Sequence, residues 1–111
     1  MKKIINTNKS PAPIGPYNQA ILKDNILFIS GQIALDPVSM KLKNETIEEE
    51  TNQVMLNLKH ILKEAKMDFS NVVKTSIFLS DMDLFKDVND IYGKYIKSVS
   101  YTHLTLPTTN S

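Results

Sequence analysis

The sequence contains no cysteine and no arginine. Without cysteine there is no disulfide, no thiol nucleophile and no zinc–thiolate site, which is most compatible with a reducing cytoplasm. All thirteen basic residues are lysines. The chain therefore lacks the planar guanidinium fork that binds a carboxylate through two parallel hydrogen bonds.

Long apolar runs and an excess of one charge are also missing. No run approaches the roughly 20 apolar residues that span a bilayer, and no apolar core follows the first two lysines, as a secretory signal requires. Acids and bases are interspersed to a net charge of +1, so neither a nucleic acid nor a membrane is expected as a partner. A chain of 111 residues is enough for one compact domain and too short for two.

The first third of the chain is typical of strands joined by a rigid loop. Residues 2–6 are a short β-prone run, and the prolines of the SPAPIGP segment that follows fix φ and remove amide donors. Residues 19–23 and 26–33 predict a hairpin, because the Asp-Asn pair between them tolerates positive φ.

Two later segments predict amphipathic helices. Thr46 and Glu49 form a capping box before residues 47–66, whose apolar positions recur every three or four residues. Residues 72–79 predict a β-branched strand, and a second helix is expected at 84–96. This order predicts an α+β fold with both helices on one face of a single sheet, whose unpaired edge needs a further strand.

Four motifs appear in an order and spacing that resemble the RidA/YjgF family: PIGPYNQA at 13–20, ISGQI at 29–33, VVKTSIFLSDMDLF at 72–85 and VNDIY at 88–92. The resemblance covers nearly everything up to about residue 97. It implies a chorismate-mutase-like subunit and a homotrimer, with three active sites in the clefts between subunits.

The resemblance also implies a function. Members of this family hydrolyse reactive 2-imino acids, such as 2-iminobutanoate and 2-iminopropanoate, to 2-oxo acids and ammonia without a cofactor. Two alternatives stay open: a non-catalytic ligand-binding or regulatory member of the superfamily, and an inactive fragment. Ribonuclease and translation-inhibitor activities are also associated with the family, but the sequence has no basic patch to support them.

Four residues in the matching motifs are candidates for substrate binding. The resemblance implies that Tyr17 forms an aromatic wall, that Ser30 and Gly31 offer hydroxyl and backbone contacts, and that Asn89 lines or braces the cleft. Taken alone, Tyr17 is more typical of a loop anchor, and Asn89 is more typical of a solvated or bracing helix residue. Gly31 is at least as typical of a β-bulge, and Ser30 can be a buried hydroxyl bonded only to backbone. His60, on a lysine-rich helix, is expected to be exposed.

No catalytic or metal-binding residue is assigned. The family's arginine and glutamate come from C-terminal strands that the matching part of this chain does not contain. Neither histidine has a partner at metal-ligand spacing.

Residues 98–111 depart from the family pattern, which continues through a Pro-Ala-Arg-Ser type segment into another strand. Here the chain reads SVSYTHLTLPTTNS, and residues 99–108 equal the translation of a transposon-end sequencing adapter. We therefore expect residues 1–97 to be an incomplete RidA-like domain and residues 98–111 a non-native tail. The YTHLTL stretch has β-propensity all the same, and can lie along a sheet edge.

Overall fold

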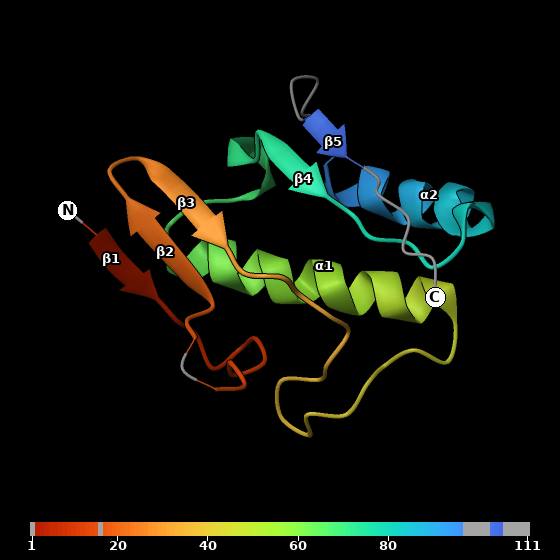
Figure 1. Ribbon diagram of the computed structural model, residues 1–111, viewed down its shortest axis with the longest axis horizontal. Helices are drawn as coiled ribbons and strands as arrows, with labels where there is room; N and C mark the ends of the chain where they lie inside the picture. Colours follow the sequence, from red (N-terminus) through yellow and green to blue (C-terminus); the bar gives the residue numbers. More distant parts are fainter. Residues whose placement is uncertain (1, 16, 97–102, 106–111) are drawn as a thin grey trace.

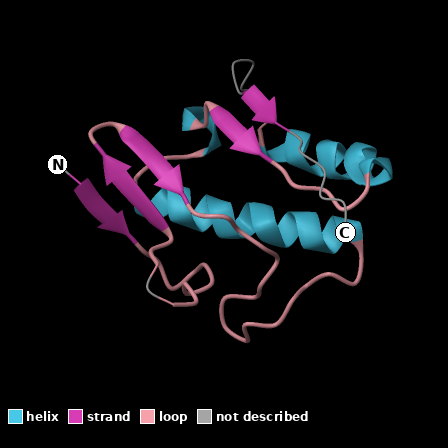
Figure 2. Ribbon diagram, in the orientation of Figure 1, coloured by secondary structure: helices cyan, strands magenta, loops and turns pink. Residues whose placement is uncertain are grey.

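The computed structural model describes residues 2–15, 17–96 and 103–105 (Figure 1). Its strands are β1 (Lys2–Ile5), β2 (Ala20–Lys23), β3 (Ile26–Ile29), β4 (Lys74–Ser76) and β5 (His103–Thr105). Its helices are α1 (Ile47–Glu64) and α2 (Phe85–Tyr95), with short 3₁₀ helices η1 (Phe69–Asn71) and η2 (Met82–Leu84). The strands lie on one side and both long helices on the other, which confirms an α+β fold (Figure 2).

The first sheet contains β1, β2 and β3 in that order, all antiparallel. The predicted hairpin is confirmed, with Lys23 opposite Ile26 and a turn in which Asp24 has a φ of 55°. The second strand of the hairpin ends at Ile29, whereas residues up to 33 were predicted to belong to it. Beyond this point the carbonyls of Ile33 and Leu35 accept hydrogen bonds from the Asn57 side chain of α1 instead of from a neighbouring strand.

The predicted strand at 72–79 does not join this sheet. Its regular part, β4, pairs in parallel with β5 to form a second sheet of two strands. The prediction of one sheet containing the hairpin and this strand is therefore wrong for the described chain. The free edges of β3 and β4 face each other in Figure 1, and no strand of the described chain lies between them.

β5 confirms that the C-terminal stretch can lie along a sheet edge. Its residues are the described part of the segment 98–111, and the rest of that segment lies outside the described residues. Pairing alone does not decide whether the stretch is native, because any sequence of sufficient β-propensity can add to an exposed strand edge. The non-native tail stays a prediction.

Local signals account for both ends of α1. The Thr46 hydroxyl accepts a hydrogen bond from the Glu49 amide at 3.0 Å, which is the Thr46 half of the predicted capping box. Glutamates occupy the first turn, where the helix dipole favours negative charge. The helix ends at Glu64, and Lys66 then adopts a φ of 60°, which cannot continue a right-handed helix.

Buried side chains of α1 pack in two directions. One cluster joins α1 to the first sheet and a second joins it to α2; they consist of Ile5, Ala20 and Ile61, and of Met55, Tyr92 and Ile96. α1 is thus the element that holds the two halves of the molecule together. No helix of the described chain is long and apolar enough to cross a membrane.

His60 is half-buried on α1, and its Nδ1 atom is buried without a hydrogen-bond partner among the described residues. The expectation that this side chain is exposed is therefore wrong. Desolvation, followed by the charges of Lys9, Lys59 and Lys63, lowers its pKa from the usual 6.5. The folded chain favours the neutral imidazole.

This lowered pKa predicts a loss of stability on mild acidification. Below about pH 6.5 the unfolded chain takes up a proton at this position more readily than the folded chain, so the free energy of unfolding falls as the pH drops from about 7 to about 5. Urea unfolding at a series of pH values measures this slope. His60→Gln should flatten this slope. His103→Gln removes the other histidine, and its slope should stay steeper than that of His60→Gln. Equal slopes in the two variants would contradict the prediction.

Candidate functional site

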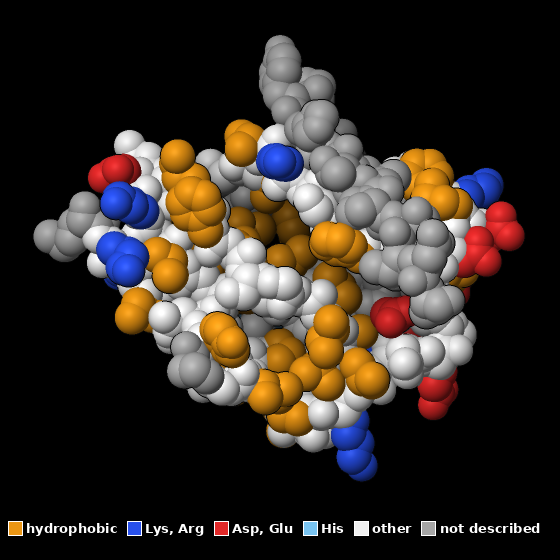
Figure 3. All heavy atoms as spheres, in the orientation of Figure 1, with side chains coloured by type: hydrophobic (Ala, Val, Ile, Leu, Met, Phe, Trp, Pro, Cys, Tyr) orange, Lys and Arg blue, Asp and Glu red, His pale blue; other side chains and the backbone are white. Residues whose placement is uncertain are grey.

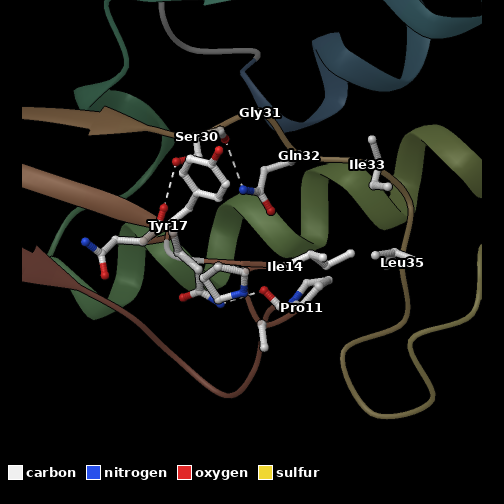
Figure 4. A pocket seen from close by; sticks show the side chains of 12 residues that line it. Pro11, Ile14, Tyr17, Ser30, Gly31, Gln32, Ile33 and Leu35 are labelled. Carbon is white, nitrogen blue, oxygen red and sulfur yellow. Dashed lines mark hydrogen bonds between the residues drawn. The ribbon is translucent and has the colours of Figure 1, made fainter.

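A pocket of about 310 Å³ opens where the loop 11–19 faces the segment 30–35 (Figure 4). This volume suits a small molecule. The lining is mostly apolar, with a few amide and hydroxyl groups: Pro11, Ala12, Pro13, Ile14, Tyr17, Asn18, Gln19, Ser30, Gly31, Gln32, Ile33 and Leu35.

Three of the four candidate residues come together here. The Tyr17 side chain is 70% exposed, and Figure 4 shows its ring beside Ser30. The Ser30 hydroxyl donates to the Asn18 carbonyl at 2.7 Å, so the hydroxyl bonds to backbone but is exposed rather than buried. Gly31 follows the end of β3, and a Cβ added to it would meet no atom within 4 Å.

Asn89 does not line this pocket. It is exposed in the middle of α2, which packs against α1 at a distance from the loop 11–19. Its predicted role at the cleft stays a prediction for this chain. The tyrosine of the same motif, Tyr92, is a buried core residue that packs in the cluster between α1 and α2.

The first wall of the pocket is shaped by a glutamine that the sequence analysis did not single out. Gln19 is 3% exposed, and its side-chain amide forms hydrogen bonds with the backbone of the proline-rich loop. Its Oε1 accepts from the Thr7 amide at 2.6 Å, and its Nε2 donates to the carbonyls of Thr7, Ser10 and Pro11 at 3.0, 3.2 and 2.8 Å. The only available signal was its position as the first residue of a predicted strand, directly after the proline-rich loop.

The second wall depends on Asn57, which the sequence analysis also missed. This residue of α1 is fully buried, and its Nδ2 donates to the carbonyls of Ile33 and Leu35 at 3.2 and 3.0 Å. A polar residue at an apolar position of the helix, between Val54 and Ile61, was the signal that could have revealed it.

No described residue of the pocket lining carries a formal charge. Among the described residues that line it there is no lysine, histidine, aspartate or glutamate. Asp36 lies just beyond it, where the amides of Ser39 and Val38 donate to its carboxylate and lower its pKa, which fits a turn-stabilising role. Within the part of the chain that the structure describes, no cluster of acidic and histidine side chains could hold a metal ion.

Comparison with known proteins gives consistent matches over most of the chain. A family model described as endoribonuclease L-PSP matches residues 7–108, which extends into the segment predicted to be non-native. A RutC family protein from Synechocystis is 52% identical over 94 residues, or 84% of this chain and 72% of that protein. The human 2-iminobutanoate/2-iminopropanoate deaminase is 47% identical over 98 residues, or 88% of this chain and 72% of that enzyme.

Solved structures show the same fold. A Rid family protein of unknown function from Yersinia pestis superposes with a TM-score of 0.94 at 36% identity. The superposition covers 98% of this chain and 86% of the other.

The glycines on either side of the pocket should respond differently to alanine. Gly31→Ala should change the free energy of unfolding by less than about 1 kcal/mol, because open space surrounds the site and its φ is not positive. Gly15→Ala should cost about 1–2 kcal/mol, because its φ of 92° disfavours any side chain. Denaturant unfolding of the two variants tests this; a larger loss for Gly31→Ala would support the bulge interpretation instead.

Proposed function

The chain belongs to the endoribonuclease L-PSP family, also called the RidA/YjgF family, and on this basis we propose that its parent protein is an imine deaminase. The substrates would be reactive 2-imino acids such as 2-iminobutanoate and 2-iminopropanoate, hydrolysed to 2-oxo acids and ammonia without a cofactor. The 47% identity to a human enzyme of that name carries the proposal. We also propose that the intact protein removes such intermediates in the cytoplasm.

The pocket suits a small imino acid. The Tyr17 ring would form one wall beside the substrate. The Gly31 amide has no hydrogen-bond partner among the described residues, so it is free to donate to a substrate oxygen. The Ser30 hydroxyl already donates to Asn18, and its oxygen can therefore accept from an iminium N–H. Apolar lining residues such as Ile33 would contact the substrate side chain.

We propose that the 111-residue chain has little or no deaminase activity. The substrate carries a carboxylate, and the described pocket lining offers no cation to bind it. The whole sequence contains no arginine that could supply a bidentate contact from elsewhere. A nuclease function has less support, because phosphate binding also needs cationic side chains.

A homotrimer is proposed from an exposed apolar surface on the first sheet. Ile4, Ile21 and Phe28 lie side by side across β1, β2 and β3, on the face turned away from α1. Ile4 is 55% exposed and Phe28 62%, and Figure 3 shows apolar side chains gathered over β2 and β3. A contiguous apolar face of this kind marks an interaction surface. Packing three such faces together would bury this apolar surface. Because Asn89 lies away from the pocket of its own subunit, it could line only the pocket of a neighbouring subunit in such a trimer.

The gap in the strand layer supports the proposal that residues 1–97 are an incomplete domain. Figure 3 shows the surface hollowed between β3 and β4, with apolar side chains in its floor. Both strands have an unpaired edge toward this hollow among the described residues. We propose that a strand following residue 97 in the intact protein completes the sheet here, and that residues 98–111 replace it with a non-native tail.

Activity is predicted to be far below that of an intact relative. Loss of a buried charge-assisted contact typically costs roughly 2–5 kcal/mol, or about 30- to several-thousand-fold in catalytic efficiency. Supplying 2-iminobutanoate from a coupled dehydratase and following its loss measures this, with the human relative as the positive control. Turnover at the relative's rate would refute the prediction and assign the carboxylate contact to a lysine.

Exchange of the tail is predicted to restore assembly and activity. Deleting residues 99–111 removes β5, which adds only three residue pairs at the edge of β4. Since we propose that the tail is non-native, the deletion should change the free energy of unfolding little. Replacing residues 98–111 with the C-terminal segment of the human relative should give a soluble trimer that hydrolyses the imine. Size-exclusion chromatography with light scattering on the three proteins tests the assembly. If the 111-residue chain is already a stable trimer that dissociates on the deletion, the tail is native structure.

A further inference from the structure

We propose that Asn57 is a positioning residue that holds both walls of the pocket in place from a single turn of α1. The proposal rests on the proposed function in one respect, namely that this pocket is the substrate site. The geometry that carries it does not depend on which substrate is bound. Asn57 itself does not line the pocket, so it acts through the residues that do.

The wall at 30–35 depends on the Asn57 side chain. After β3 ends, the carbonyls of Ile33 and Leu35 find their hydrogen bonds on Asn57 Nδ2, at 3.2 and 3.0 Å. Both of these residues line the pocket. The orientation of the amide is set from within the helix, because Gln53 Nε2 donates to Asn57 Oδ1 at 2.9 Å. The NH₂ group therefore faces the segment 30–35.

The wall at 11–19 depends on the backbone of the same residue. The buried Ser10 hydroxyl donates to the Asn57 carbonyl at 2.6 Å. The Ser10 carbonyl in turn accepts from Gln19 Nε2 at 3.2 Å, and the same nitrogen donates to Pro11 at 2.8 Å. The Gln19 carbonyl accepts from the Ser30 amide at 2.9 Å, which connects this wall back to the other. The two loops and α1 therefore form one closed set of hydrogen bonds.

Packing alone does not explain a polar residue at this position. Asn57 is 0% exposed on a helix face otherwise directed at the apolar core, where a leucine would bury more apolar surface. A leucine would leave the two carbonyls of the loop without their donor, and buried groups without partners are costly. The amide thus fixes where Ser30 to Leu35 lie relative to the helix.

Asn57→Asp tests the proposal with almost no change of volume. The substitution turns the two donors into an oxygen that faces the Ile33 and Leu35 carbonyls, while Gln53 can still donate to the other oxygen. Amide hydrogen exchange by NMR on the full chain is the readout. Exchange at Ser30 and Lys43, whose amides are bonded to Gln19 and Ala34, should become on the order of tenfold to a hundredfold faster. Exchange at Ile61 in the core of α1 should change much less.

Thr51→Val is the matched control. Thr51 is also a buried polar residue of α1, but its hydroxyl donates only to the Ile47 carbonyl within the helix. It should not accelerate exchange at Ser30 selectively. A pH series separates positioning from a general loss of stability, because a protonated aspartic acid can donate one hydrogen bond. Each protection factor is compared with that of the unsubstituted chain at the same pH, because His60 lies one turn away on α1 and its titration destabilises every variant on acidification. Relative to that reference, acidification should restore part of the lost protection factor in Asn57→Asp and none of it in Asn57→Ala.

Ser10→Ala gives a milder test should the Asn57 variants not fold. It removes the bond to the Asn57 carbonyl and should accelerate exchange at Tyr17 and Ser30 over that at Ile61. The proposal is overturned if exchange rises uniformly along the chain, or if Thr51→Val reproduces the pattern. Because no substrate is used, failure here leaves the imine-deaminase proposal standing, and failure of the activity assays leaves this one standing.

Discussion

Every backbone carbonyl that leaves a strand ladder and stays away from water needs another donor, and this requirement shapes the chain around its pocket. β3 stops at Ile29, and the following segment runs over α1 instead of continuing in the sheet. Two buried side-chain amides, those of Asn57 and Gln19, supply the missing donors. The prolines of the first loop make this supply necessary, since they remove donors that the loop would otherwise offer to itself.

The same helix that supplies Asn57 also unites the two parts of the apolar core. One cluster binds α1 to the hairpin and the other binds it to α2. In the described chain, β3 and β4 are not hydrogen-bonded to each other. The packing of α1 against the hairpin and against α2 therefore determines how the two sheets lie relative to each other. The pocket walls are hydrogen-bonded to Asn57 of α1 and, through the Ser30 amide and the Gln19 carbonyl, to each other at the end of the hairpin. The shape of the pocket should therefore depend on α1 and the hairpin more directly than on α2.

The parts of the fold that follow local rules could be predicted from the sequence. The Asp-Asn turn, the capping threonine and the helical spacing of apolar residues depend on neighbours within one or two turns, and each lies where it was expected. The end of β3 could not be predicted, because it depends on Asn57, more than twenty residues away. His60 was assigned to the surface from its lysine-rich surroundings, yet its Nδ1 atom is buried without a partner among the described residues. Of the candidate site residues, the three on the hairpin and its preceding loop meet in one pocket, whereas Asn89 lies on an element that packs elsewhere.

The described part of the pocket has a defined shape but no charge to pair with a charged ligand. The pocket supplies an aromatic ring, a free glycine amide and a hydroxyl, held by buried amides, and no lining residue of the described chain is ionic. Neutral donors can orient a small carboxylate but compensate poorly for taking its charge out of water. A cation contributed by a neighbouring strand or subunit would add that compensation to a pocket whose walls are already in place. Under the proposed function, substitutions in the hydrogen-bonded walls should therefore alter mainly how well a substrate is oriented, and a contributed cation should affect mainly how tightly it is bound.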